Sequence, residues 1–255
     1  MMILGTPARR VSAPWNKASL AVISHAGIPM NCLANEYGTY SGATIGTRAS
    51  TIGKCPSFSG GTEKIVFQGA PIVQRDVTIG MIVHHRGAFG TNDTVCSTAA
   101  LSSAGYTIRN QGFTLNIAGV ANVDSGMSIS QDTPVFLVCS KDLKAGVTRF
   151  FIKHLTNNTV IWTAVADTNL AGNGDGYFAI GGTGGGTGNS WLGEIAMVYI
   201  EFSAFPIMRI NQWLDNPWAP FMPESQYAKW APPAVAGGFN PGWAYGATKI
   251  IGGAF

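Results

Sequence analysis

The most constraining feature of this sequence is a series of short segments in which apolar residues occupy every second position. Glycine, proline, asparagine and aspartate separate these segments. Successive side chains of a strand point to opposite faces, so the alternation predicts strands with one apolar face each. We expect the following residues to face an apolar interior between two sheets: Val77, Ile79, Met81, Phe113, Leu115, Ile117 and Ile195.

Strand-like segments recur along most of the chain, with turn residues between them. The expected strands are 18–25, 64–68, 77–85, 113–118, 134–140, 147–155, 160–166, 177–181 and 190–202. The run 134–140 is apolar almost throughout, which is typical of a strand covered on both faces. This organisation predicts an all-β fold, a two-sheet antiparallel sandwich.

One segment has helical periodicity. Pro206 suits a first helical turn, where its missing N–H is not needed, and Ile207, Ile210 and Leu214 follow at helical spacing. Asn216 precedes a proline, which disfavours further helix. We therefore expect one short helix directly after the last strand.

Both ends of the chain lack the strand pattern. We expect an N-terminal arm over residues 1–16, the sandwich over 17–218 and a C-terminal arm rich in Pro, Gly and Trp over 219–255. The arm either folds back on its own domain or also contacts neighbouring subunits, and large aromatic side chains are the natural anchors. The candidate interface residues are Trp218, Trp230, Trp243 and Phe239.

Charge and hydropathy exclude two classes of partner. Charged residues make up 11% of the chain and the net charge is +3, with Arg9–Arg10 as the one adjacent basic pair. Nucleic-acid binding requires a clustered basic face, so we expect no nucleic-acid partner. No window approaches the roughly 18 apolar residues that a membrane-spanning helix needs, so we expect no membrane insertion.

The four cysteines lie far apart, without a C-x-x-C pair. Zinc sites generally have closely spaced ligand pairs, so no structural zinc is expected. The N-terminus lacks the apolar core of a signal peptide, which predicts synthesis in a reducing cytoplasm. We therefore favour buried free thiols over disulfides for Cys32, Cys55, Cys96 and Cys139.

The residues that could carry catalysis are sparse. A glycosidase needs two carboxylates facing one cleft. Glu194 and Glu201 are separated by an odd number of positions, which places them on opposite faces of a regular strand. His84 and His85 also point to opposite faces, so they are not expected to bind one metal ion. We predict no catalytic residues and no enzymatic activity.

A polar loop at 167–176 contains hard oxygen ligands of the kind that calcium prefers. The weak calcium candidates are Asp167, Asn169, Asn173 and Asp175. The same residue types dominate ordinary turns, which is the favoured alternative. The glycine-rich segment 181–188 lacks the Gly-Lys-Ser/Thr ending of a phosphate loop. Apart from calcium, no cofactor is expected.

Several motifs occur in a characteristic order over residues 55–218. Phe58-Ser59-Gly60-Gly61 precedes an expected strand, and Tyr177–Gly182 reads as an "L-x-I-G" strand. Trp191–Tyr199 is similar to "F-x-G-x-I-x-x-V-x-I", and Asn216-Pro217-Trp218 closes the series. This order resembles laminin-G-like, concanavalin A-like jelly-roll domains. The resemblance implies a sandwich whose relatives in many cases bind calcium and sugars through loops on one rim.

The end of the chain carries a second resemblance. The N-terminal lead and the closing Asn240-Pro241-Gly242-Trp243-Ala244 resemble single-domain laminin-G-like proteins of tailed-bacteriophage virions. That resemblance implies a non-enzymatic virion structural protein, a capsid-decorating or a tail or fibre subunit. Its partners would be other virion proteins and copies of itself, and its location the virion.

The alternative function is a lectin-like, carbohydrate-binding module that recognises a host surface glycan. A binder should gather exposed aromatic side chains with Asn or Asp in a concavity. A scaffold should bury its Trp-rich arm against neighbouring subunits. The two functions can coexist on one chain.

Overall fold

A computed structural model of the protein describes residues 15, 20–25, 28–32, 36–41, 46–50, 52–68, 76–87, 93–98, 105–109, 113–117, 120–170, 176–182 and 190–221. Most of both expected arms, including Trp230, Phe239 and Trp243, lies outside these residues. The arm boundaries and the interface therefore stay predictions.

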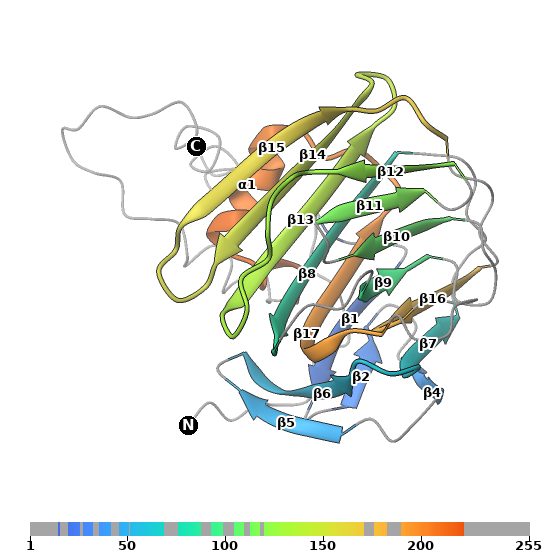
Figure 1. Ribbon diagram of the computed structural model, residues 1–255, viewed down its shortest axis with the longest axis vertical. Coiled ribbons are helices and arrows are strands. Elements are labelled where there is room, and N and C mark those ends of the chain that lie inside the picture. The colour runs from blue at the N-terminus through green and yellow to red at the C-terminus, as the bar shows by residue number, and fades with distance from the viewer. Residues whose placement is uncertain are drawn as a thin grey trace, which may run out of the picture.

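The described strands form two antiparallel sheets that lie face to face (Figure 1). The larger sheet contains β1 (Leu20–His25), β2 (Ile28–Asn31), β3 (Glu36–Tyr37), β5 (Gly46–Ser50), β6 (Gly53–Ser59), β8 (Val77–His85), β13 (Pro134–Asp142), β14 (Val147–His154), β15 (Val160–Ala166) and β17 (Leu192–Glu201). Its order is β15-β14-β13-β8-β17-β1-β2-β3, and β6 pairs with one end of β17 and with β5.

The smaller sheet has the order β12-β11-β10-β9-β16-β7-β4. Its strands are β4 (Thr39–Ser41), β7 (Lys64–Gln68), β9 (Thr94–Ser97), β10 (Tyr106–Arg109), β11 (Thr114–Ile117), β12 (Ala121–Asp124) and β16 (Tyr177–Ile180). The predicted all-β sandwich is thus confirmed. The sequence pattern missed β2–β6, β9, β10 and β12, most of which have too few residues for a period to be recognised.

The inner core lies between the two sheets. All the residues predicted to face the interior are buried there, from Val77 on β8 and Leu115 on β11 to Ile195 on β17. The central strand β13 is covered on both faces, as predicted: Leu137 belongs to the inner core and Phe136 to a second cluster on the outer face of the larger sheet.

Helix α1 (Ile207–Asp215) packs on that outer face, and the 3-10 turn η1 (Ala219–Phe221) follows it (Figure 1). The predicted helix is confirmed, but its buried stripe is shifted, because Ile210, Trp213 and Leu214 are buried whereas Ile207 is half exposed. Pro206 occupies the N-cap position with an extended backbone rather than the first turn.

The anchor of the helix is Trp213, whose indole ring occupies space that Gly80 leaves open on β8. A Cβ atom at Gly80 would lie 2.1 Å from the ring. Trp15 packs against Trp213 with ring centroids 5.0 Å apart, and Ala219 and Phe221 join the same outer cluster. The ends of the described chain therefore contribute to the core that holds α1.

A β-bulge in β17 changes which side chains of the strand point to the outer face. The register against β8 shifts between Ile195 and Met197, so that Ala196 and Met197 both face the outer cluster. The prediction that Glu194 and Glu201 lie on opposite faces is therefore wrong, because it assumed regular alternation. Both carboxylates lie on the outer side, at opposite ends of the strand and about 20 Å apart along it.

The four cysteines are free and buried, as predicted. Burial raises the pKa of Cys32 to about 11 and the pKa values of Cys55 and Cys96 to about 12. Such thiols remain protonated and unreactive at neutral pH. In the described part of the chain, no helix has both the length and the apolar character needed to cross a bilayer.

Candidate functional site

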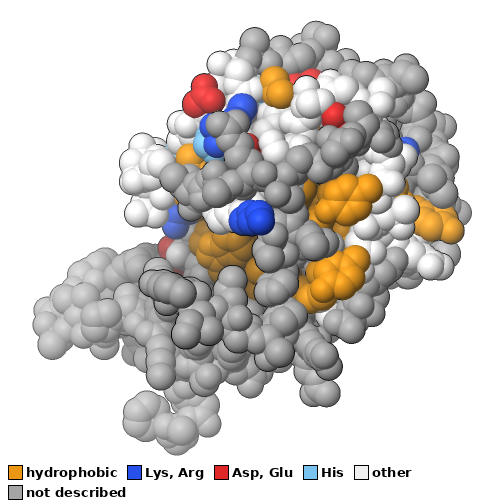
Figure 2. All heavy atoms as spheres, turned by 90° about the horizontal axis from the view of Figure 1, so that it is seen from below, with side chains coloured by type: hydrophobic (Ala, Val, Ile, Leu, Met, Phe, Trp, Pro, Cys, Tyr) orange, Lys and Arg blue, Asp and Glu red, His pale blue; other side chains and the backbone are white. Residues whose placement is uncertain are grey.

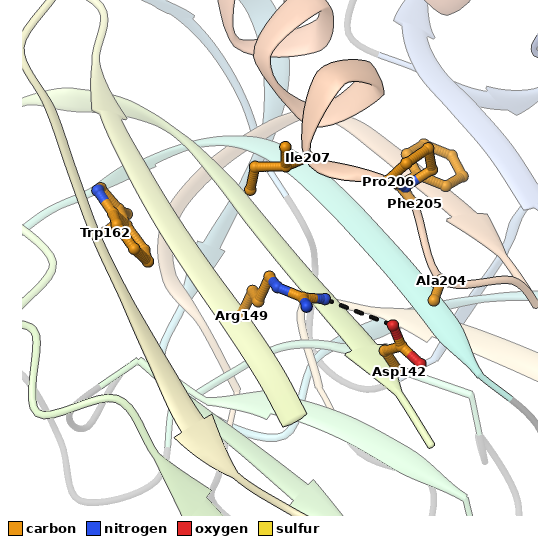
Figure 3. Close-up of a pocket in the computed structure, with 7 residues that line it drawn as sticks. All are labelled: Asp142, Arg149, Trp162, Ala204, Phe205, Pro206 and Ile207. Atoms are coloured by element: carbon orange, nitrogen blue, oxygen red, sulfur yellow. Dashed lines mark ion pairs between the residues drawn. The ribbon is translucent and has the colours of Figure 1, made fainter. Parts of the chain in front are cut away.

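A groove opens on the outer face of the larger sheet, between the start of α1 and the edge of the sheet at β14 and β15. Its volume is about 570 Å³. The groove is lined by Asp142, Arg149, Trp162, Ala204, Phe205, Pro206 and Ile207. Figure 3 shows Trp162 on one side, Pro206 and Ile207 on the other, and the Arg149–Asp142 ion pair between them.

Trp162 provides the aromatic surface of the groove. It lies in the middle of β15, an edge strand, and its register partner on β14 is Phe151. The two rings stack with centroids 6.0 Å apart and planes at 18°. Phe151 is buried, but 62% of Trp162 is exposed. A buried ring thus supports an aromatic face that solvent can reach.

Arg149 and Asp142 provide the polar groups. Their strands β13 and β14 form a hairpin, which brings an Arg149 guanidinium nitrogen within 3.6 Å of an Asp142 carboxylate oxygen. The Asp142 carboxylate also accepts a hydrogen bond of 2.9 Å from the Ala145 backbone N–H, which holds it in place. Their side chains are 27% and 26% exposed, so a ligand can reach both.

Other large hydrophobic side chains are exposed without lining the groove. They include Tyr37, Tyr40, Val120, Ile161, Leu170 and Met208. On the face seen from below in Figure 2, hydrophobic side chains lie in separate patches. Three others, Val160, Trp162 and Ile207, lie on the facing sides of β15 and α1. The region around the groove is therefore one of several places where apolar side chains are exposed.

Sequence analysis did not identify the groove. The segment 160–166 was predicted as a strand, but nothing in its pattern showed that the face carrying Trp162 would stay uncovered. The other residues come from the β13–β14 hairpin and from the start of the helix. Only the pairing of distant segments brings them together.

Of the calcium candidates, Asp167 and Asn169 are described, and Asn173 and Asp175 lie outside the described residues. One Asp167 carboxylate oxygen accepts from the Lys141 ammonium group and from the Thr148 hydroxyl. The other accepts from the Asn169 backbone and side chain, both at 3.0 Å. Among the described residues there is no group of three or more His, Cys, Asp or Glu placed to hold a metal ion.

These contacts also set the ionisation of Asp167. Burial alone would raise the pKa of this carboxyl, but the hydrogen bonds from Lys141, Thr148 and Asn169 outweigh it and lower the pKa. The carboxylate is thus bound by groups of the chain itself. Calcium binding at this loop stays a prediction.

The two adjacent histidines lie on opposite faces, as the strand parity indicates. The His85 ring is edge-on to Trp191 at 4.7 Å, and its Nε2 lies 3.4 Å from Asp93. Burial lowers the pKa of His85. On the outer face, His84 Nδ1 lies 3.5 Å from Glu194. These contacts are those of structural histidines.

The two glutamates of β17 belong to separate ion pairs. The Glu194 carboxylate accepts hydrogen bonds of 2.7 and 2.8 Å from Arg86 Nε. The Glu201 carboxylate accepts from the Tyr199 hydroxyl at 2.6 Å and from Arg209 at 2.9 Å. Each carboxylate is bound by a different cation.

Comparison with known proteins identifies the fold. No family model and no curated protein matches the chain. One similar solved structure is domain 4 of AbnA, a GH43 extracellular arabinanase from Geobacillus stearothermophilus, in complex with arabinotriose. The similarity covers 74% of this chain and 94% of that domain, with a TM-score of 0.52 and 16% sequence identity.

Two further solved structures are similar. The receptor binding domain of botulinum neurotoxin D matches 79% of this chain and 53% of its own, with a TM-score of 0.52 and 13% identity. Trypanosoma rangeli sialidase in complex with sialic acid matches 80% of this chain and 33% of its own, with a TM-score of 0.50 and 11% identity. This chain therefore spans about half the length of the neurotoxin domain and about a third of the length of the sialidase. At these identities the likeness establishes a β-sandwich.

Proposed function

We propose that this chain is a non-enzymatic glycan-binding protein and that the groove beside α1 is its binding site. The observation that carries the proposal is the exposed face of Trp162 beside the Asp142–Arg149 pair in one concavity. A sugar ring has an apolar C–H face, which packs on an aromatic ring, and hydroxyl groups at its rim. Binding sites of this kind combine apolar surface with a few placed polar groups.

The neighbouring structures support this proposal through the fold that they share with the chain. One of them, a domain matched over 94% of its length, was solved in complex with arabinotriose. A sandwich of this kind can therefore carry sugar binding.

The placement of the carboxylates supports a function without catalysis. Most glycoside hydrolases use an acid and a second carboxylate about 5–10 Å apart across the scissile bond. Glu194 and Glu201 are at opposite ends of β17, and separate arginines engage them. In the groove, Asp142 is paired with Arg149.

The setting that we propose is the virion of a tailed bacteriophage, with a host surface glycan as ligand. This part rests on the sequence resemblance of the N-terminal lead and of residues 240–244 to bacteriophage virion proteins. The C-terminal arm would then contact copies of the chain and other virion proteins. Deletion of residues 231–255 should leave glycan binding intact and prevent incorporation into particles. Unchanged occupancy on particles would contradict the assembly function.

Glycan binding is tested by titrating the full chain with purified host capsule and lipopolysaccharide polysaccharides. Trp162→Ala should weaken binding about tenfold, equivalent to about 1.4 kcal/mol. The matched control is Tyr37→Ala, which removes another exposed aromatic ring, on β3 at the far edge of the same sheet. Equal losses in both variants would contradict the proposed site. Release of reducing ends that Glu194→Gln abolishes would contradict a non-enzymatic function.

A further inference from the structure

A second hollow lies farther along the same helix. It has a volume of about 230 Å³ and is lined by Val160, Asn211, Leu214 and Asp215. Burial raises the pKa of the Asp215 carboxyl, and the nearby Lys153 opposes this shift. The second hollow therefore offers an amide and a carboxyl group beside the apolar side chain of Val160.

The groove and the second hollow have the same two walls. Ile207, Asn211 and Leu214 are spaced by four and three positions, so they form one stripe along α1. Val160 and Trp162 are two positions apart and therefore share one side of β15. The helical stripe spans about 10 Å at a rise of about 1.5 Å per residue. The two hollows therefore lie one after the other between α1 and β15, and we call them together the trough.

The helical wall of the trough is firmly attached to the sheet. The Lys153 ammonium donates a hydrogen bond of 2.6 Å to the Leu214 carbonyl, near the C-terminal end of α1. At the other end, the Phe205 backbone N–H donates to the hydroxyls of Thr78 and Ser140, both at 3.1 Å. A wall fixed at both ends is formed before any ligand arrives, so binding expends little free energy on ordering it.

The charges along the trough nearly cancel. Among the described residues that line the two hollows, the charged side chains are Arg149, Asp142 and Asp215. Arg149 is paired with Asp142, and Asp215 adds a carboxyl group at the far end. A polyanionic ligand would meet more negative than positive charge, whereas a neutral ligand rich in hydroxyls finds both donors and acceptors.

We infer that the trough binds an internal stretch of a neutral linear oligosaccharide lengthwise, with one subsite at Trp162 and a second at Asn211 and Asp215. This inference rests on the proposed glycan-binding function and specifies its ligand class. A single terminal sugar bound at Trp162 would contact the groove alone and leave the second hollow empty. A chain of sugars contacts both, because each hollow combines apolar surface with polar side chains: Trp162 with Arg149 and Asp142 in the groove, and Val160 with Asn211 and Asp215 in the second hollow.

The test is calorimetric titration of the full chain with arabinan, glucan and mannan oligosaccharides, each from the monosaccharide to the hexasaccharide. Polygalacturonate and polysialic acid are the acidic probes. The affinity for at least one neutral series should rise at least tenfold between the monosaccharide and the longer members. Asn211→Ala should reduce the affinity for long members about five- to tenfold and leave the shortest unchanged. Trp162→Ala should weaken all lengths, and Tyr37→Ala none.

Three outcomes would overturn the inference. The first is an affinity that does not change with the length of the oligosaccharide. If Trp162→Ala still abolished binding in that case, the proposed glycan-binding function would remain intact. The second is tighter binding of the acidic polymers. The third is protection of Trp162 from hydroxyl radicals before any sugar is added, which would show that a protein segment fills the trough. Absence of binding to every glycan, with Trp162 accessible, would instead overturn the proposed function itself.

Discussion

The outer face of the larger sheet has a region where a tryptophan is buried and a region where a tryptophan is exposed. On the covered half of the outer face, Trp213 is 0% exposed and lies above Gly80, with the rings of Trp15 and Tyr199 each 5.0 Å away. On the open half, Trp162 is 62% exposed and stacks on Phe151. Both are tryptophans on the outer side of the larger sheet. The difference arises because α1 lies over the central strands and leaves the edge strand β15 uncovered.

A similar contrast between buried and accessible side chains exists across the two faces of β13, at two neighbouring residues. Lys141 points to the inner side and forms a fully buried ion pair with Asp167. Asp142 points to the outer side and forms a partly exposed pair with Arg149 in the groove. The covered positions therefore stabilise the fold, whereas the open positions remain available to a ligand.

The largest expected effect compares the two tryptophans. Trp213→Ala should lower the free energy of unfolding by about 3–5 kcal/mol, because it removes the anchor of α1 and leaves a cavity. Trp162→Ala should change it by less than about 0.5 kcal/mol, as is usual for an exposed side chain. Urea unfolding measures both values. Similar losses would mean that the open half is also part of the stabilising core.

The second comparison concerns the two ion pairs. Asp167→Asn leaves the Lys141 ammonium buried without its counter-charge, which typically costs about 3–5 kcal/mol. Asp142→Asn should cost at most about 1 kcal/mol, because water reaches its pair with Arg149. The free energies of unfolding at neutral pH provide the measurement. A larger loss for Asp142→Asn would reverse the assignment of the two pairs.

A third experiment examines the space above β8. Gly80→Ala should lower the free energy of unfolding by about 1–3 kcal/mol, because the added methyl group overlaps the Trp213 ring. In a Trp213→Ala background the same change should have little effect, since the ring is gone. A double-mutant cycle measures this coupling, and additive losses would argue against the steric explanation.

The smallest expected effect is a pH dependence from Asp167. Its pKa is lowered in the folded state, since the hydrogen bonds from Lys141, Thr148 and Asn169 outweigh the effect of burial. The group therefore contributes stability that is fully present above its unfolded pKa of about 3.9 and is lost as the pH falls through the folded pKa. The Asp142→Asn variant should lose stability with falling pH in the same way as the unchanged protein, because it retains Asp167. Asp167→Asn should show a shallower dependence, and an unchanged profile would contradict the lowered pKa.

The local pattern predicted much of the fold. The alternating residues of β8 and β11 that were predicted to face the interior are buried there, as is Ile195 on β17, and β7 and β15 begin and end where the pattern placed them. The candidate site was far less predictable. Trp162, Arg149 and Asp142 had no signal that distinguished them from other strand residues, and the helix was expected to bury Ile207 where Trp213 is the anchor.

The sequence alone determined the fold class, because alternation within a strand is a local property that a few neighbouring residues express. It also determined helix α1, through its period and the prolines around it. Only the tertiary structure decided which outer positions are covered. That outcome depends on residues far apart in the chain, such as Gly80 beneath Trp213 and the bulge that turns Glu194 and Glu201 to the same side. Whether Trp162 is buried or exposed likewise depends on the place at which α1 lies on the sheet, because burial follows from packing rather than from residue type.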